Sequence, residues 1–242
     1  MNTHQPHIKI EKGVEYQLGE HKQDYILYNF KKILQYLEVK GKSLYGKKFK
    51  IYHEDKPILY KLCTYFIKDF ESCKKLQIDL NKGILLTGPV GCGKTSLMNL
   101  MRFITPQKKA YTISPCRNIV FGFNNLGFRT IEDFGNEGSF CFDDLGVEPT
   151  GRHYGKDCNV MGEILLSRYD LFLRNLSTDK QRQKSHQKSQ HSPLPSNLHT
   201  THITTNLNAE ELEERYGNRV RSRMRAMFNL LSFDKTSEDK RL

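Results

Sequence analysis

A glycine-rich stretch at residues 82–97 constrains the fold of this chain more than any other segment. It begins with a short apolar run, Ile84–Leu86, which has the composition of a buried strand. The octapeptide Gly88–Thr95 follows and fits the pattern G-x-x-x-x-G-K-[ST], and the segment from Thr95 to about Ile104 is compatible with a helix. Strand, loop and helix therefore come in the order that a phosphate-binding loop requires.

The residue types of this loop suit a nucleotide with Mg²⁺. Glycines let the backbone curl so that several N–H groups face phosphate oxygens, and the start of the following helix adds further N–H groups and a positive dipole end. Lys94 can reach the β- and γ-phosphates, and the Thr95 hydroxyl can bind Mg²⁺. An accidental glycine-rich turn is the alternative, which the flanking strand and helix disfavour. The predicted phosphate-binding residues are Gly88, Pro89, Val90, Gly91, Cys92, Gly93, Lys94, Thr95 and Ser96.

The composition is that of an ordinary soluble protein, with 37% hydrophobic and 27% charged residues in 242. No apolar run approaches the roughly 18 residues of a membrane span, and the first residues carry no apolar signal core, so we expect a cytoplasmic protein without a membrane partner. Six cysteines without a C-x-x-C pair indicate reduced thiols. The formal net charge of +11 favours polyanion partners such as DNA, although a solvated basic surface remains the alternative.

The first 80 residues carry no motif. Residues 1–22 are polar and aperiodic, which predicts a mobile arm, and helical spacing of apolar residues predicts helices over 24–40 and 55–76. We therefore expect 23–80 to form a small, mostly helical region that binds a partner or serves as a linker. Its basic and aromatic run at 40–50 fits either contact with nucleic acid or a solvated loop.

A second signal is the apolar run from Ser139 that ends in Asp143 and Asp144. Beside a phosphate-binding loop, Asp143 at the strand end would hold Mg²⁺ through water, and Asp144 would orient or deprotonate the attacking water. Two acids at a strand end could instead cap the following turn. The loop upstream favours the catalytic interpretation.

The rest of the chain, 81–242, is predicted to form one nucleotide-binding domain. We expect a strand at 110–113, a helix over 116–134 broken at Gly122 and Gly127, and an apolar helix over 159–175. The polar, basic and low-complexity stretch at about 175–198 is interpreted as a disordered insertion rather than a DNA-binding finger.

Polar residues near the C-terminus complete the predicted site. A β-branched strand over 201–206 ends in Asn206, which can hydrogen-bond the γ-phosphate and the attacking water if its strand lies between the loop strand and the Asp143 strand, although a turn asparagine is the alternative. After a helix over 209–216, Arg219 and Arg223 are four residues apart and share one helical face. Either can act as an arginine finger on a neighbouring subunit, with Arg223 placed first, or face solvent or DNA. A closing strand over 227–233 follows.

Taken together, these motifs resemble the AAA+ ATPases of the DnaC-type helicase loaders and the IstB-type transposition helpers. The resemblance rests on four stretches, in that family's order: Gly88–Thr95, Phe142–Gly146, Ile203–Leu207 and Arg215–Arg225. It implies an α/β P-loop NTPase core of the AAA+/ASCE type, with a five-stranded parallel sheet in the order 5-1-4-3-2 flanked by helices. It also implies Walker A roles for Lys94 and Thr95, Walker B roles for Asp143 and Asp144, a sensor 1 role for Asn206 and a finger role for Arg223.

The function that the resemblance implies is ATP hydrolysis coupled to assembly on DNA, most simply the loading of a replicative helicase by a homo-oligomer in its ATP state. The acidic pair is Asp-Asp where many AAA+ proteins have Asp-Glu, so we expect slow hydrolysis that DNA or a partner stimulates. The alternatives are a transposition or mobile-element ATPase with a transposase partner, and a nucleotide-gated DNA-binding scaffold with little turnover. A small-molecule P-loop kinase is disfavoured, because Asn206 and the arginines would then have no role.

Overall fold

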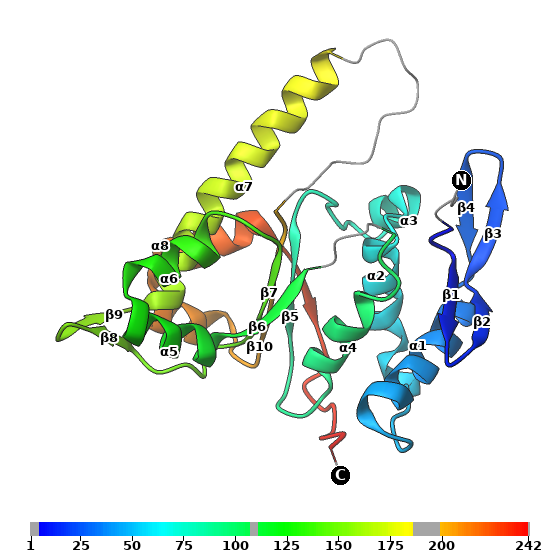
Figure 1. The fold of residues 1–242 in the computed structure, drawn as a ribbon, viewed down its shortest axis with the longest axis horizontal. Coiled ribbons are helices and arrows are strands. Elements are labelled where there is room, and N and C mark those ends of the chain that lie inside the picture. The colour runs from blue at the N-terminus through cyan, green and yellow to red at the C-terminus, as the bar shows by residue number, and fades with distance from the viewer. Residues whose placement is uncertain (1–4, 107–110, 186–198, 242) are drawn as a thin grey trace. The chain divides into compact units, whose positions relative to one another are not determined.

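The computed structural model describes residues 5–106, 111–185 and 199–241. The chain divides into two compact units, one formed by residues 1–78 and 96–110 and the other by residues 79–95 and 111–242 (Figure 1). The candidate functional residues belong to the second unit, except Ser96.

The second unit is built on a five-stranded parallel sheet (Figure 1). Its order is β11-β5-β10-β7-β6, which in chain order is 5-1-4-3-2, so the predicted fold class is confirmed. Strand β5 is buried from Gly83 to Leu86, as expected of a parallel strand covered on both faces. The strands are β5 (Gly83–Thr87), β6 (Thr112–Pro115), β7 (Phe140–Leu145), β10 (Thr201–Thr205) and β11 (Phe228–Ser232).

One face of this sheet is covered by α5 (Cys116–Leu126), α7 (Val160–Ser185) and α8 (Ala209–Met227), which form a continuous apolar core with the strands. Helix α6 (Phe128–Gly135) packs against α7, and a hairpin of β8 (Gly151–His153) and β9 (Lys156–Cys158) packs against α5. The break between α5 and α6 lies at Gly127, which has φ 61°. Gly122, where a second break was predicted, stays inside α5, since an isolated glycine is tolerated within a helix.

Helix α7 is longer than predicted. It continues to Ser185, so the first part of the predicted insertion at about 175–198 is helical rather than disordered. Residues 175–185 are rich in Lys, Gln and Arg, whose helix propensity is high although they offer no apolar face. The remainder of the insertion, 186–198, lies outside the described residues.

Helix α8 contains an internal break that divides it into two halves. Its first half starts with a capping box, in which Asn208 and Glu211 bond each other's backbone N–H groups. The break is at Gly217, with φ 82° and ψ 159°, a conformation that glycine adopts without a steric penalty. The predicted helix therefore ends at the break, and a second helical half carries the arginines.

The first unit contains β-structure in the segment predicted to be a mobile arm. Strands β1 (Ile8–Glu11) and β2 (Val14–Gln17) form one antiparallel hairpin, and β3 (Gly19–Lys22) and β4 (Tyr25–Tyr28) form another. Lys12 and Gly13 both have positive φ, 51° and 79°, as a two-residue type I′ hairpin turn requires. The sequence reasoning attended to polarity and missed this turn.

Helices make up the rest of the first unit, as the sequence predicted for most of 23–80. They are α1 (Phe30–Tyr45), the short 3₁₀ helix η1 (His53–Asp55), α2 (Lys56–Phe66), α3 (Phe70–Lys75) and the part of α4 (Lys94–Met101) that follows Thr95. Two details differ from the prediction. The helix expected from residue 24 begins only after the N-cap Asn29, because β4 precedes it, and the helix expected over 55–76 is two helices separated near Lys68, which has φ 62°.

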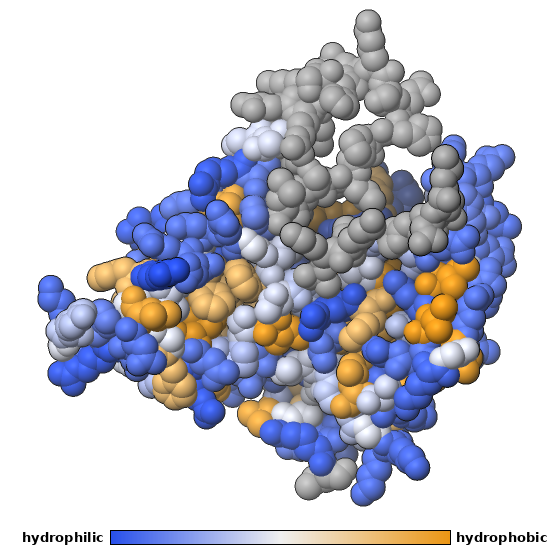
Figure 2. Space-filling model, in the orientation of Figure 1, coloured by the Kyte–Doolittle hydropathy of each residue, from blue (hydrophilic) through white to orange (hydrophobic). Residues whose placement is uncertain are grey.

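The described parts of the chain contain no helix with the length and apolarity of a membrane span. Hydrophilic residues predominate on the face drawn in Figure 2, with smaller apolar groups among them. The six cysteines, all among the described residues, form no disulfide.

Candidate nucleotide-binding site

The glycine-rich loop joins β5 to α4 and folds around its own lysine. The Lys94 side chain is only 6% exposed, and its Nζ donates to the carbonyl oxygens of Gly88 and Pro89, each at 2.8 Å. Gly91 and Gly93 have φ 81° and 101°, values that residues with a Cβ rarely adopt. The sequence pattern thus produces a compact loop with the ammonium group at its centre.

The other predicted loop residues differ in exposure. Val90 is 60% exposed, whereas Cys92 is buried with its Sγ 3.9 Å from Lys94 Nζ. Ser96 follows Thr95 in α4 and belongs to the first unit. Of the predicted phosphate-binding residues, Gly88 to Thr95 therefore belong to the second unit and Ser96 does not.

Asp143 is the centre of a hydrogen-bond network with two threonines. Its Oδ1 accepts from the Thr95 hydroxyl at 2.8 Å and from the Thr204 hydroxyl at 2.6 Å. Burial raises the pKa of Asp143, and the hydrogen bonds from Thr204 and Thr95 offset part of that rise. The sequence predicted Asp143 and Thr95 as the Mg²⁺ residues, and the structure brings these two side chains into contact.

Thr204 is a site residue that sequence reasoning missed. It is fully buried in β10, and besides donating to Asp143 it accepts from the backbone N–H of Asp144 at 2.9 Å. Asp144 itself is exposed and has φ 53°, a left-handed conformation that aspartate adopts more readily than most residues. One hydroxyl thus holds both members of the acidic pair.

Asn206 directly follows β10, which lies between β5 and β7 in the sheet. Thr205 is in register with Thr87 on one side and with Leu145 on the other, so the chain after β10 emerges between the phosphate loop and the acidic pair. Asn206 is exposed at this edge. This is the strand placement that the sensor interpretation assumed.

The two candidate finger residues have different surroundings. Arg219 is exposed, and within the part of the chain that the structure describes its side chain makes no hydrogen bond or ion pair. Arg223 is half-buried, with its guanidinium 4.9 Å from the centroid of the Tyr169 ring of α7. Between them, Arg221 forms an ion pair with Glu213. Arg219 therefore has the more available guanidinium.

A buried carboxylate just beyond the acidic pair was also missed by the sequence reasoning. Glu148 is 4% exposed, and its Oε2 accepts from the backbone N–H of Gly146 at 2.8 Å. Its Oε1 accepts from the Tyr216 hydroxyl and lies 3.5 Å from Arg215 Nε. No local pattern marks Glu148, because Tyr216 and Arg215 lie far along the chain.

The segment after β11 returns to the phosphate loop. The backbone N–H of Phe233 donates to the Thr87 carbonyl at 2.9 Å, and that of Lys240 donates to the Gly91 carbonyl at 3.1 Å. The Asp239 carboxylate lies over Gly91, where a Cβ would meet its carbon at 2.2 Å. Residues 233–240 thus pack on the outside of the loop.

A large cavity opens beside the start of the loop. Its volume is about 550 Å³, and its lining is mostly apolar with several polar side chains. Strands β5, β10 and β11, helix α8 and the loops beside them contribute to the lining, which includes Leu85, Thr205, Leu230, Met224, Pro89 and Asn206. The second unit therefore offers space next to the phosphate loop for the rest of a nucleotide or for another ligand.

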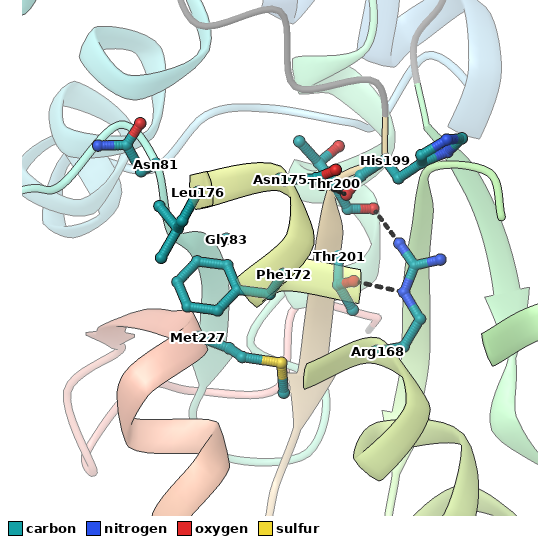
Figure 3. A pocket seen from close by; sticks show the side chains of 10 residues that line it. All are labelled: Asn81, Gly83, Arg168, Phe172, Asn175, Leu176, His199, Thr200, Thr201 and Met227. Atoms are coloured by element: carbon teal, nitrogen blue, oxygen red, sulfur yellow. Dashed lines mark hydrogen bonds between the residues drawn. The ribbon is translucent and has the colours of Figure 1, made fainter. Parts of the chain in front are cut away.

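A second cavity lies at the opposite end of the sheet and is too small for a nucleotide, at about 20 Å³ (Figure 3). The buried Arg168 reaches into this region from α7 and donates to Thr201 Oγ1 at 2.7 Å and to the Thr200 carbonyl at 3.1 Å (Figure 3). It also donates to the carbonyls of Glu137 and Gly138. Arg168 therefore joins the amino ends of β7 and β10, and we assign it a structural role.

The donor set fits a nucleotide that brings its own Mg²⁺. Among the described residues, no group of three or more His, Cys, Asp or Glu side chains is placed to hold a metal ion. Mg²⁺ commonly uses one or two protein oxygens together with substrate phosphates and water, and Thr95 and Asp143 provide two such oxygens. Sheet order, phosphate loop and acidic strand end together give the second unit the fold of a P-loop NTPase core.

The solved structures that are similar to this chain include the following two. One is a DnaC helicase loader, at 19% identity with a TM-score of 0.49 over 78% of this chain and 95% of that one. The other is a "putative primosome component" from Streptococcus pyogenes serotype M3, at 18% identity with a TM-score of 0.47 over 77% of this chain and 83% of that one. No family model matches the chain, and no curated protein matches it. At these identities and scores, the functional argument depends on the residues of the site.

Proposed function

We propose that this chain binds ATP with Mg²⁺ and hydrolyses it slowly as an AAA+ protein that loads a replicative helicase onto DNA in the cytoplasm. The observation that carries the ATPase part is the contact between Thr95 Oγ1 and Asp143 Oδ1, 2.8 Å apart and 48 residues apart in sequence. A phosphate-loop hydroxyl and a strand-end carboxylate that meet in this way form the paired oxygen site of P-loop ATPases.

Each residue of the site has a defined task in this proposal. The loop N–H groups and Lys94 bind the phosphates, and Thr95 and Asp143 hold Mg²⁺ directly or through water. Mg²⁺ held by these residues would offset the negative charge of the phosphates. Asp144 orients or deprotonates the attacking water, and Asn206 donates to the γ-phosphate and this water. An aspartate reaches less far than a glutamate, which supports slow turnover.

A second subunit supplies the remaining charge. Arg219 acts as the trans-acting finger in this proposal, ahead of Arg223, because the Arg223 guanidinium lies over Tyr169 of its own chain. An arginine supplied in trans accelerates phosphoryl transfer by about 10³- to 10⁵-fold. The ATP-bound protein is therefore expected to assemble into a homo-oligomer.

DNA and a replicative helicase are proposed as partners from the net charge and the motif resemblance, and not from contacts of individual residues. The net charge of +11 favours a polyanion, and the helicase is taken from the resemblance of the four motifs. A transposition ATPase would use the same core with a transposase. Co-purification of the tagged chain with a replicative helicase supports the first function, and co-purification with a transposase supports the second.

The experiment that tests the ATPase proposal measures hydrolysis against protein concentration, with and without single-stranded DNA. Wild type, Lys94→Ala and Arg219→Ala are assayed alone, and the two variants are also assayed as a mixture. Sites shared between subunits predict a rate per protein that rises with concentration and a mixture that is more active than either variant. A concentration-independent rate without rescue would refute the trans arrangement.

The scaffold alternative is tested by Asp144→Asn. Hydrolysis that is measurable in wild type and lost in Asp144→Asn excludes a scaffold without turnover. A rate that ignores DNA and rises with a small phosphate acceptor would instead favour a kinase.

A further inference from the structure

Glu148 connects the acidic turn to another part of the fold. It lies four residues after Asp144, and through Oε2 it accepts from the N–H of Gly146, inside the turn that follows the acidic pair. A carboxylate this well buried is costly unless it is fully hydrogen-bonded. The groups that satisfy its other oxygen come from α8.

The first half of α8 ends at this carboxylate. Tyr216 donates its hydroxyl to Glu148 Oε1, and the Arg215 guanidinium donates to the Glu148 backbone carbonyl. Burial, together with the charge of Glu148, raises the pKa of Tyr216 far above its usual value, so the phenol remains a donor at working pH. The Arg215 carbonyl in turn accepts from Asn159, at the start of α7.

The arginine half of α8 begins immediately after this contact. Gly217 has non-helical φ and ψ of 82° and 159°, so a kink separates the direction of the second half from that of the first. Arg219 is only three residues beyond Tyr216. The bond between Tyr216 and Glu148 is therefore the last side-chain anchor before the candidate finger.

We infer that Glu148 is a positioning residue that fixes the arginine half of α8, through Tyr216, relative to the acidic turn. The inference rests on the proposed ATPase function and adds a residue to it. The Glu148 carboxylate accepts from Gly146 in the turn and from Tyr216 in α8. A displacement of the turn or of α8 therefore breaks a hydrogen bond to a buried carboxylate, which is unfavourable. Glu148 does not touch the reacting phosphate and acts only through the residues that it holds.

The experiment compares Tyr216→Phe and Glu148→Gln with Glu214→Gln, an exposed control on the same helix. Tyr216→Phe removes the hydroxyl that donates to Glu148 and accepts from Arg215 Nε, and leaves the bond to the acidic turn in place, whereas Glu148→Gln also disturbs that bond. We expect the KM for ATP to stay within about twofold and kcat to fall about 10- to 100-fold in Tyr216→Phe, as for the loss of a hydrogen bond to a charged group. Because the defect lies in the arginine donor, mixing with Lys94→Ala should restore hydrolysis as it does for Arg219→Ala.

A second readout does not depend on hydrolysis. Amide hydrogen exchange should speed up over 218–227 in Tyr216→Phe while strand β5 stays protected as in wild type. A kcat and exchange pattern equal to that of Glu214→Gln would overturn the inference. So would a loss of kcat that Lys94→Ala cannot rescue when it does rescue Arg219→Ala. If Glu148→Gln fails to fold, Tyr216→Phe decides.

Failure of the proposed function is distinguishable from failure of this inference. Absence of hydrolysis in wild type, or absence of rescue for Arg219→Ala, would count against the proposed function. The exchange measurement then decides on Glu148 alone, since unchanged exchange over 218–227 overturns the anchoring and faster exchange supports it.

Discussion

Replacing Thr204 by valine should destabilise the second unit and disturb its acidic pair at the same time. The side chain is fully buried, and valine matches its shape, so the substitution removes the hydroxyl without opening a cavity. Two hydrogen bonds are lost, one to the Asp143 carboxylate at 2.6 Å and one from the Asp144 N–H at 2.9 Å. Asp143 keeps its bond from Thr95.

The expected magnitude follows from these two bonds. A hydrogen bond to a charged group contributes about 1.5–3 kcal/mol, and a donor left without a partner costs about 1–3 kcal/mol if it is buried. The Asp144 N–H is only part-buried, so the lower end of the second range applies. The free energy of unfolding should fall by about 2–4 kcal/mol, which for a unit of this size lowers the melting temperature by roughly 5–15 °C.

The assay is urea unfolding followed by far-ultraviolet circular dichroism or tyrosine fluorescence, which is usable because the chain has no tryptophan and 12 tyrosines. The matched control is Thr112→Val, on exposed strand β6 of the same sheet, which should change stability by less than about 0.5 kcal/mol. A Thr204→Val loss no larger than that of the control would refute the assignment of the two hydrogen bonds.

Three further outcomes are expected. Lys94→Ala should abolish binding of a fluorescent ATP analogue while the unfolding transition stays cooperative, and retained binding would contradict the loop assignment. Arg168→Met should lower the free energy of unfolding by about 1–3 kcal/mol, because the part-buried carbonyls of Glu137, Gly138 and Thr200 lose their donor, against little change in the exposed control Arg174→Met. Burial lowers the pKa of Lys68 to about 8 from 10.5. Below pH 8 Lys68 is charged in both states, and its buried charge lowers the free energy of unfolding. As the pH rises from 8 to 10.5, Lys68 loses its proton in the folded state and the free energy of unfolding rises. The first unit should therefore gain about 2 kcal/mol between pH 7 and 10 relative to Lys68→Met, and equal pH profiles would contradict the shift.

The parts of the site that could be predicted from sequence are those whose signal is local. The phosphate loop is a contiguous pattern, and the acidic pair ends a recognisable apolar run, so the sequence alone assigns the first to a strand–helix connection and the second to a strand end. The sheet order came with the resemblance and is confirmed.

The residues that were missed act over long sequence separations. Thr204 reaches Asp143 across 61 positions and Tyr216 reaches Glu148 across 68, and neither contact leaves a periodic or spaced pattern in the chain. The N-terminal hairpins were missed for another reason, since their strands are only four residues long and their main signal is the turn at Lys12 and Gly13. Arg219 and Arg223 shared a helical face in sequence, and only packing against Tyr169 distinguished them.

The two hydrogen bonds from Lys94 to its own loop set a threshold for any ligand. The ammonium group is already satisfied by two carbonyl oxygens, so a ligand must offer more than these neutral acceptors to recruit it. A phosphate oxygen carries negative charge and therefore attracts the ammonium group more strongly than a neutral carbonyl oxygen does. A polyphosphate therefore compensates for the loss of the two carbonyl bonds, whereas a neutral or weakly charged ligand of the same shape does not. The loop thus selects ligands by their charge before base or sugar contributes. Its affinity for a triphosphate depends on how much stronger the bonds from Lys94 to phosphate are than the bonds from Lys94 to the two carbonyls that they replace.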